Sequence, residues 1–325
     1  MTKIASIGVF TSGGDAPGMN AAVRAVVRTA LHNNLKVFGI FRGYSGMIED
    51  EISELDRRSV SGVVQRGGTI LKTSRSPEFE TPEGRQKAYK NLKKHGITGL
   101  IGIGGDGTFH GLLDITKETD FYVIGLPGTI DNDIYGTDFT IGYDTAVNTA
   151  IEAIDKIRDT AQSHDRLFIV EVMGRNAGFI GLETGIACGA EEICIPEFRT
   201  DLESIAEHLQ ERHMKKKISL IMVVAEGDDA GDANTIARKL KEMVGISYRV
   251  TVLGHIQRGG SPTSKDRLLA SKLGYHAVKA LLVGKSGIMI GEVHNRISET
   301  PLEETWTRKK SIDYEMMEMA RILAK

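Results

Sequence analysis

Features that are scarce in this 325-residue sequence exclude several classes of protein. The only two cysteines, Cys188 and Cys194, lack the CxxC spacing of redox and zinc sites, so we expect buried free thiols. The 41 basic and 43 acidic residues leave no excess charge that would favour nucleic acid as a partner. No apolar run approaches about 18 residues, and the first residues predict a strand in place of a leader. We therefore expect a cytoplasmic protein without a membrane partner.

The length is sufficient for a large core and about two domains. Hydrophobic residues make up 41% and charged residues 26% of the chain, as in ordinary globular proteins. Apolar runs alternate with helical patterns, without a short repeat or a low-complexity linker. The patterns predict strands at 4–10, 37–41, 99–103, 121–126, 167–173 and 218–225, and helices at 21–31, 86–94, 143–160 and 278–282.

The loop PGTIDND, at 127–133, carries residues suited to chemistry. It follows the apolar run 121–126 and so lies at the carboxyl end of a strand, where open α/β sheets bind ligands. The side chains of Thr129, Asp131 and Asp133 suit positioning of a substrate hydroxyl, removal of its proton and binding of a metal-bound phosphate. The alternative is an Asp/Asn-rich turn that binds nothing.

Two glycine-rich turns predict phosphate sites. Gly13 and Gly14 lie between the strand 4–10 and the helix 21–31, and GGDGT at 104–108 also joins a strand to a helix. Backbone N–H groups converge on an anion at such turns. Residues 102–107 match GxGxxG, which leaves a nicotinamide-binding dehydrogenase or a nucleotide sensor as an alternative. Asp106 favours a magnesium-nucleotide instead, because its charge repels a bare pyrophosphate.

A second stretch that looks like a nucleotide-binding motif is not a Walker A loop. Gly-Lys-Ser at 284–286 looks like the end of a Walker A loop, but Lys279 occupies the position of the required first glycine. The sequence therefore predicts a nucleotide site of a different kind.

Charged residues gather near predicted strand ends in the second half of the chain. Arg166 and Arg175 lie nine residues apart in loops, as in a phosphate clamp, with separate surface ion pairs as the alternative. Two arginines, a histidine and a glutamine beside paired glycines favour ligand binding: Arg249, His255, Gln257 and Arg258. Arg24 and Arg28, four residues apart on one helix, form either a solvated face or a further anion site.

Five motifs in a fixed order make the chain resemble the bacterial ATP-dependent 6-phosphofructokinase family over essentially its whole length. They are TSGGDAPGMNAA (11–22), GGDGT (104–108), PGTIDND (127–133), EVMGR (171–175) and RVTVLGHIQRGGSPTSKDR (249–267). The resemblance implies two doubly wound α/β domains with mostly parallel sheets, assembled as a homotetramer. The larger domain, 1–138 and 252–304, is expected to bind ATP, and the smaller, 139–251 and 305–325, fructose 6-phosphate.

The resemblance also implies roles for individual residues. Asp131 is expected to be the base that takes the proton of the sugar 1-hydroxyl, with Arg75, Thr129 and Asp133 assisting. ATP is expected to contact Gly14, Arg75, Ser76, Gly105, Asp106, Gly107 and Thr108, with Asp106 binding Mg²⁺. Fructose 6-phosphate is expected to contact Thr129, Ile130, Asp131, Arg166, Met173, Gly174, Arg175, Glu226, Arg249, His255, Ile256, Gln257 and Arg258. Among these, Arg166 and Arg249 resemble arginines that reach the 6-phosphate from a neighbouring subunit.

The implied reaction gives fructose 1,6-bisphosphate and ADP, the committed step of glycolysis. An allosteric site for ADP, with phosphoenolpyruvate competing, is implied at Arg24, Arg28, Arg57, Arg158, Gly189, Ala190, Glu191, Lys215 and Lys217.

The nearest alternative to an ATP-dependent enzyme is a pyrophosphate-dependent enzyme of the same fold. In that branch a second acid typically follows GGD and a lysine typically replaces the glycine of PGT. Gly107 and Gly128 at these positions favour ATP as the donor.

Overall fold

The structure is a computed structural model that describes residues 4–164, 167–214 and 220–324. The chain forms two compact units. Unit 1 comprises Met1–Ile130, Ile134–Thr145 and Arg258–Lys310, and unit 2 comprises Asp131–Asp133, Ala146–Gln257 and Ser311–Lys325. The domain limits implied by the family resemblance stay a prediction, and each unit is described by itself.

Unit 1 is built on a seven-stranded sheet in the order β11-β10-β5-β4-β1-β2-β3. Its strands are β1 (Ser6–Thr11), β2 (Lys36–Ile40), β3 (Ile52–Glu54), β4 (Gly99–Gly104), β5 (Tyr122–Pro127), β10 (Ile288–Val293) and β11 (Arg296–Pro301). The five central strands are parallel, and β3 and β11 pair antiparallel at the two edges. After β1 the chain builds outward through β2 and β3, then returns to the other side of β1 with β4. The carboxyl ends of β1 and β4 therefore form a switch point, where such sheets bind ligands.

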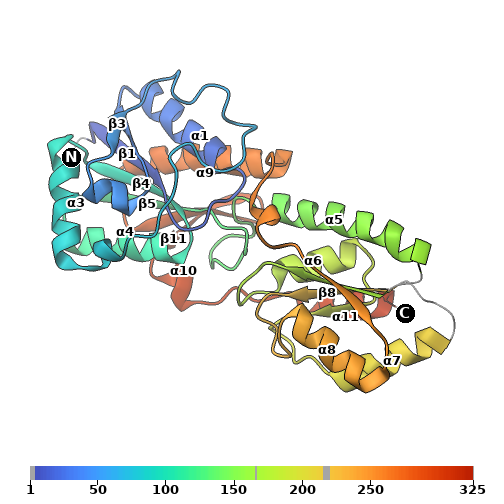
Figure 1. Ribbon diagram of the computed structural model, residues 1–325. Coiled ribbons are helices and arrows are strands. Elements are labelled where there is room, and N and C mark those ends of the chain that lie inside the picture. Colours follow the sequence, from blue (N-terminus) through green and yellow to red (C-terminus); the bar gives the residue numbers. More distant parts are fainter. Residues whose placement is uncertain (1–3, 165–166, 215–219, 325) are drawn as a thin grey trace. The chain divides into compact units, whose positions relative to one another are not determined.

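Helices cover both faces of this sheet (Figure 1). α1 (Met19–His32) and α9 (Ser264–Leu282) pack against each other on one face, and α3 (Pro82–Lys94) and α4 (Asp106–Glu118) cover the other. The shorter elements are α2 (Tyr44–Ile48), η1 (Pro77–Glu80) and α10 (Glu304–Thr307). Large side chains such as Phe10, Phe109 and Leu100 are fully buried between α3, α4 and the sheet.

Unit 2 contains a four-stranded, wholly parallel sheet in the order β7-β8-β6-β9. Its strands are β6 (Leu167–Val172), β7 (Glu192–Cys194), β8 (Leu220–Ala225) and β9 (Tyr248–Val252), and η2 (Gly254–Arg258) follows β9. α7 (Leu202–Met214) and α8 (Ala233–Val244) pack on one face, with α6 (Phe179–Ala187) and α11 (Tyr314–Leu323) on the other (Figure 1). α5 (Tyr143–His164) begins in unit 1, and its residues after Thr145 belong to unit 2. The two mostly parallel sheets with helices on both faces confirm the predicted fold class.

Two helices are longer than the sequence predicted. The helix expected at 278–282 is the end of α9, which begins at Ser264 because Thr263 caps it by accepting a hydrogen bond from the Asp266 N–H. The helix expected at 143–160 continues to His164, so Ser163 and His164 are helical and not part of a loop.

Both cysteines are free thiols, although Cys188 is half-buried and only Cys194 is buried. Within the described ranges, no helix combines the length and apolarity needed to cross a membrane.

Candidate active site

The turn after β1 lies at the switch point of unit 1 and leaves its glycines exposed. The Ser12 N–H donates to the Ile103 carbonyl of neighbouring β4 at 3.0 Å, which fixes the start of the turn. Gly13 has φ of +80°, a conformation that favours glycine. The Arg258 guanidinium lies against the turn and donates to the Asp15 carbonyl at 3.2 Å. A Cβ on Gly14 would approach this guanidinium to 2.3 Å, so Gly14 lets the arginine lie close to the backbone.

The amino-terminal turn of α4 follows β4 directly. Gly105 is the N-cap, Asp106 and Gly107 are exposed, and Thr108 is buried. The Thr108 hydroxyl oxygen has no hydrogen-bond partner among the described residues, and a Cβ on Gly104 would come within 2.2 Å of it. The helix dipole at this end favours an anion.

The residues at this turn fit a magnesium ion that arrives with a nucleotide. Magnesium usually takes one or two carboxylates and completes its octahedral shell with water and substrate phosphates. Asp106 supplies one exposed carboxylate, and the described residues contain no group of three or more His, Cys, Asp or Glu that would form a metal site by themselves. The donor set therefore fits Mg²⁺ shared with phosphates and not a closed protein cage.

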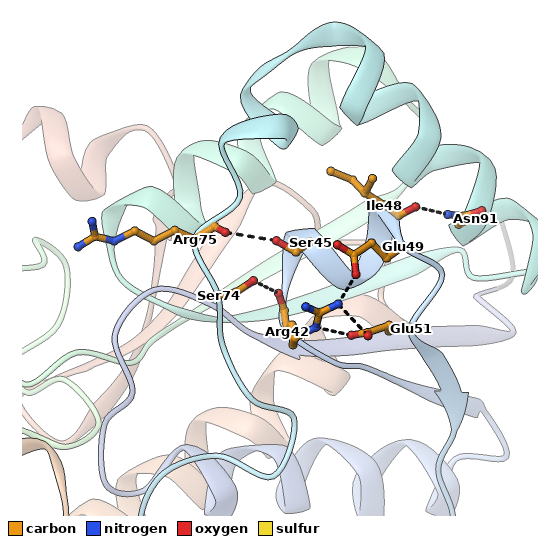
Figure 2. Close-up of polar contacts among 8 residues, drawn as sticks. All are labelled: Arg42, Ser45, Ile48, Glu49, Glu51, Ser74, Arg75 and Asn91. Carbon is orange, nitrogen blue, oxygen red and sulfur yellow. Dashed lines mark hydrogen bonds and ion pairs between the residues drawn. The ribbon is translucent and has the colours of Figure 1, made fainter.

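A hydrogen bond holds the backbone of Arg75, whereas its side chain is exposed. The Ser45 hydroxyl donates to the Arg75 carbonyl at 3.3 Å, and the Ser74 hydroxyl donates to the Arg42 carbonyl at 3.0 Å. Figure 2 shows Arg42 paired with Glu51, to which its Nε donates at 2.6 Å, while Arg75 points away from this cluster. Arg75 is exposed and Ser76 is half-buried. The segment thus presents the exposed Arg75 side chain on a backbone held by hydrogen bonds.

The loop after β5 is anchored to the switch point by close backbone contacts. The Gly128 N–H donates to the Gly104 carbonyl at 2.9 Å. A Cβ on Gly128 would lie 2.9 Å from Ile103 Cγ2 and 3.1 Å from Met19 Cε. Thr129 is half-buried and Ile130 is fully buried. The start of the loop is therefore tightly packed.

The remaining loop residues, Asp131–Asp133, are grouped with unit 2. Asp131 is only 4% exposed, whereas the Asp133 side chain is half-buried. Between them, Asn132 has φ of +56°, a left-handed conformation that asparagine tolerates better than most residues. The left-handed residue turns the chain sharply between the two carboxylates.

In unit 2 the ends of β6, β8 and β9 bring another set of predicted residues together. The Glu226 N–H donates to the Val172 carbonyl at 2.8 Å, and the Arg175 N–H donates to the Glu226 carboxylate at 3.3 Å. The Met173 N–H donates to Gln257 Oε1 at 2.8 Å. Gln257 is 0% exposed, so its contribution is to hold the Met173 backbone.

The glycine of this turn is required by the backbone. Gly174 has φ of +152°, and a Cβ there would lie 2.3 Å from the Ala177 carbonyl oxygen. Arg175 itself is left-handed, with φ of +53°, and exposed. Arg249 on β9, together with His255 and Ile256 of η2, is also exposed. Arg166 lies outside the described residues.

The residues expected to form an effector site fall in both units. In unit 2, Arg158 donates to the carbonyls of Cys188 at 2.7 Å and Gly189 at 3.1 Å, and its guanidinium lies 4.0 Å from Glu191. Ala190 is buried beside them. In unit 1, Arg24 and Arg28 lie four residues apart on α1, and burial and then the charge of Arg28 lower the pKa of Arg24. Arg57 is exposed in unit 1, and Lys215 and Lys217 lie outside the described residues.

One supporting residue was missed by the sequence-based assignment of roles. Asn20 is 1% exposed, donates to the carbonyls of Arg66 and Gly67, and accepts from the Ile70 N–H at 2.7 Å. It thus ties the 66–70 segment to the first turn of α1. The available signal was an asparagine in an otherwise small or apolar helical turn.

Comparisons with known proteins agree on one family. The family model described as Phosphofructokinase matches residues 6–281. ATP-dependent 6-phosphofructokinase 1 of Thermus thermophilus is 57% identical over 318 residues, which cover 98% of this chain and 99% of that protein. ATP-dependent 6-phosphofructokinase 2 of Bacteroides thetaiotaomicron is 51% identical over 325 residues, and both chains are fully covered.

A solved structure supports the same relationship. The phosphofructokinase from Saccharomyces cerevisiae superposes with a TM-score of 0.87 at 37% identity. The match covers 98% of this chain and 48% of the yeast chain, so the chain spans about half the length of that relative. From the family match and the two bacterial relatives, this chain belongs to the phosphofructokinase family.

Proposed function

We propose that the protein transfers the γ-phosphoryl group of ATP to the 1-hydroxyl of fructose 6-phosphate, giving fructose 1,6-bisphosphate and ADP in glycolysis. The observation that carries the proposal is the meeting of three strand ends in unit 1. The turn after β1, the amino-terminal turn of α4 and the loop before Asp131 are joined by the hydrogen bonds from Ser12 to Ile103 and from Gly128 to Gly104. This is the arrangement that an in-line phosphoryl transfer needs, because catalysis there is mainly positioning and charge stabilisation.

The nucleotide is assigned to the switch point of unit 1. Its phosphates would contact Gly14, Ser76 and the turn Gly105 to Thr108, where N–H groups and the helix dipole stabilise negative charge. Asp106 would hold Mg²⁺, which when bound offsets charge on the β- and γ-phosphates. Arg75 would place its guanidinium on the phosphoryl group in transfer. The exposure of Asp106 and Arg75 supports these roles.

The loop 129–133 is assigned to the chemical step. Asp131 would take the proton of the attacking hydroxyl, and Thr129 and Asp133 would orient the sugar and the metal-bound phosphate. A carboxylate suits this role because proton removal occurs as the oxygen bonds to phosphorus. The burial of Asp131 supports the role, since a base that is largely shielded from water is held in a fixed environment by its surroundings.

The sugar phosphate is assigned to the strand ends of unit 2. Met173, Gly174, Arg175, Glu226, His255, Ile256 and Gln257 would contact it within one subunit, and so would Arg258, which is counted with unit 1. Arg166 and Arg249 would reach its 6-phosphate from a neighbouring subunit of a homotetramer. Arginine suits this role because its planar guanidinium binds phosphate in a bidentate manner.

Two glycines support ATP over pyrophosphate as the donor. A side chain at Gly128 would collide with Ile103 and Met19, so the lysine of the pyrophosphate-dependent branch needs the surrounding structure to shift. A Cβ at Gly107 meets nothing within 4 Å, which leaves open space beside the α4 turn for a longer polyphosphate. Both features favour the nucleotide.

Regulation is proposed from the same family resemblance. ADP would bind at Arg24, Arg28, Arg57, Arg158, Gly189, Ala190, Glu191, Lys215 and Lys217, with phosphoenolpyruvate competing, in a cytoplasmic enzyme. The contacts of Arg158 with Cys188 and Gly189 support this by placing cationic and backbone groups together.

A donor comparison tests the proposal. Product formation from fructose 6-phosphate is measured with MgATP and with magnesium pyrophosphate, then repeated with ADP and with phosphoenolpyruvate. We expect turnover with ATP and none with pyrophosphate. Turnover with pyrophosphate alone would contradict the assignment of the donor. Unchanged sugar saturation in the presence of both effectors would contradict the regulatory proposal only.

A further inference from the structure

The carboxylate of Asp266 is buried in unit 1, and the proposed function gives it no contact with the nucleotide or with the sugar phosphate. It belongs to the first turn of α9 and is 1% exposed. Its Oδ1 accepts from the Gly142 N–H and its Oδ2 from the Thr145 N–H, both at 2.8 Å. The Thr145 hydroxyl also donates to Oδ2. Burial raises the pKa of this carboxyl, and the hydrogen bonds from Thr145 and Gly142 oppose the rise.

These contacts fix a short segment that leads into α5. Thr145 is the last residue of that segment in unit 1, and its hydroxyl also accepts from the Thr263 N–H at 3.0 Å. Asp266 of α9 and the preceding N-cap residue Thr263 therefore both hold the first turn of α5. A buried charge is costly unless several donors satisfy it, so a role in orientation explains its presence better than a gain in stability.

The same segment supports the proposed catalytic loop. Next to Gly142, the Ile141 N–H donates to the Pro127 carbonyl at 2.8 Å and forms an isolated bridge with Gly128. The Thr140 hydroxyl donates to the Thr129 carbonyl at 2.6 Å. Hydrogen bonds at both ends of the short backbone segment 140–142 therefore connect Asp266 with the backbone just before Asp131.

We propose that Asp266 is a positioning residue for phosphoryl transfer, which fixes segment 140–145 and through it the backbone of Thr129. This inference rests on the proposed function of the 129–133 loop. The carboxylate never touches substrate. Its effect is to keep Thr129 and the following Asp131 in the geometry that the transfer step requires, where a displacement of about 1 Å can cost about a hundredfold in rate.

The test compares Asp266→Asn with Thr140→Val and with the control Asp232→Asn. Asparagine keeps the shape of Asp266 but turns an N–H₂ group toward backbone donors, and valine removes only the hydroxyl that reaches Thr129. Asp232 caps α8 in unit 2 by accepting from the Thr235 N–H, outside the proposed site. We expect kcat to fall about tenfold or more in the first two variants, with both KM values within about threefold of wild type and the control unchanged.

A double variant separates positioning from general destabilisation. If Asp266 and Thr140 act in one series, Asp266→Asn with Thr140→Val lowers kcat no further than the more impaired single variant. Multiplying effects, or a kcat within twofold of wild type for Asp266→Asn, would overturn the inference. If Asp266→Asn does not fold, Thr140→Val is the deciding variant, and a kcat within twofold of wild type for Thr140→Val would overturn the inference. Asp131→Asn is assayed in parallel. If Asp131→Asn keeps its turnover, the proposed role of the loop is wrong. If Asp131→Asn loses turnover while Asp266→Asn does not, only this inference is wrong.

Discussion

Unit 1 presents its strand ends through glycines and backbone N–H groups, whereas unit 2 presents charged side chains at the ends of its strands. Gly14, Gly105 and Gly107 surround the switch point of unit 1. Arg175 and Glu226 lie at the ends of β6 and β8 in unit 2. Backbone groups suit a polyphosphate that must approach closely, and long cations suit a single phosphate at the far end of a sugar. The contrast predicts that adding side chains to the turns of unit 1 impairs nucleotide binding. It also predicts that removing charged side chains from unit 2 impairs sugar-phosphate binding.

The largest effect is expected at Asp131, where the proposed chemistry occurs. Asp131→Asn keeps the shape of the side chain but cannot accept the proton, and general base catalysis is worth about 10²- to 10⁴-fold. We expect kcat to fall by that factor while fructose 6-phosphate still binds. Steady-state kinetics and equilibrium binding measure the two quantities. Wild-type turnover would show that the loop has no role in proton removal.

Gly107→Asp sharpens the comparison by adding a charge to unit 1. A second carboxylate in the α4 turn would repel the triphosphate by about 1–4 kcal/mol at about 4 Å, or roughly five- to a thousandfold in kcat/KM for ATP. Fold stability should be unaffected, because a Cβ there meets nothing within 4 Å and acids are favourable in a first helical turn. The control is Gly107→Asn, which adds similar volume without charge. Equal losses in both variants would mean that space and not charge matters.

Arg249→Ala tests the reverse behaviour in unit 2. A charge-assisted hydrogen bond is worth about 1.5–3 kcal/mol, so affinity for fructose 6-phosphate should fall about ten- to a hundredfold with little change in the KM of ATP. Arg238→Ala removes another exposed arginine of unit 2, on α8, and should change neither constant. Unchanged sugar affinity in Arg249→Ala would break the comparison.

The smallest effect is expected in stability, from adding one methyl group to unit 1. Gly104→Ala would place a Cβ 2.2 Å from Thr108 Oγ1 and 2.5 Å from the Ser12 carbonyl oxygen. Such overpacking costs about 1–3 kcal/mol, which denaturant unfolding measures. Gly107→Ala places its methyl group in open space on helix α4 and should instead raise the free energy of unfolding by about 0.4–1 kcal/mol. A similar loss in both would mean that the tight contact at Gly104 is not the cause.

The sequence predicted the strand cores because apolar runs and glycine turns are local signals, whereas the fold class came from the family resemblance. β11 went unnoticed, since Arg296–Pro301 is a polar, largely exposed edge strand without a clear alternation of apolar residues. Most of α9 was also missed because Gly274 weakens its pattern, although that glycine lets α9 approach the backbone of α1: a Cβ there would lie 2.8 Å from the Ala22 carbonyl oxygen.

The candidate site shows the same limit. The turns with Gly14 and Gly105 were visible because their motifs are contiguous, and the family resemblance supplied roles for distant residues. The support of Thr129 by Thr140, and of Gly142 by Asp266, joins residues 11 and 124 positions apart. No local pattern encodes such pairs, so only the folded chain reveals them.

The division of the chain into interleaved segments has a consequence for biosynthesis. Unit 2 includes 311–325, and Tyr314 of that segment packs its ring edge-on against Phe198 at 5.2 Å between centroids. Unit 1 likewise needs Arg258–Lys310, which supplies α9 and two strands of its sheet. A ribosome must therefore release the chain through Lys310 before unit 1 can close and through the 311–325 segment before unit 2 can. A nascent chain stalled midway would expose two incomplete cores to chaperones.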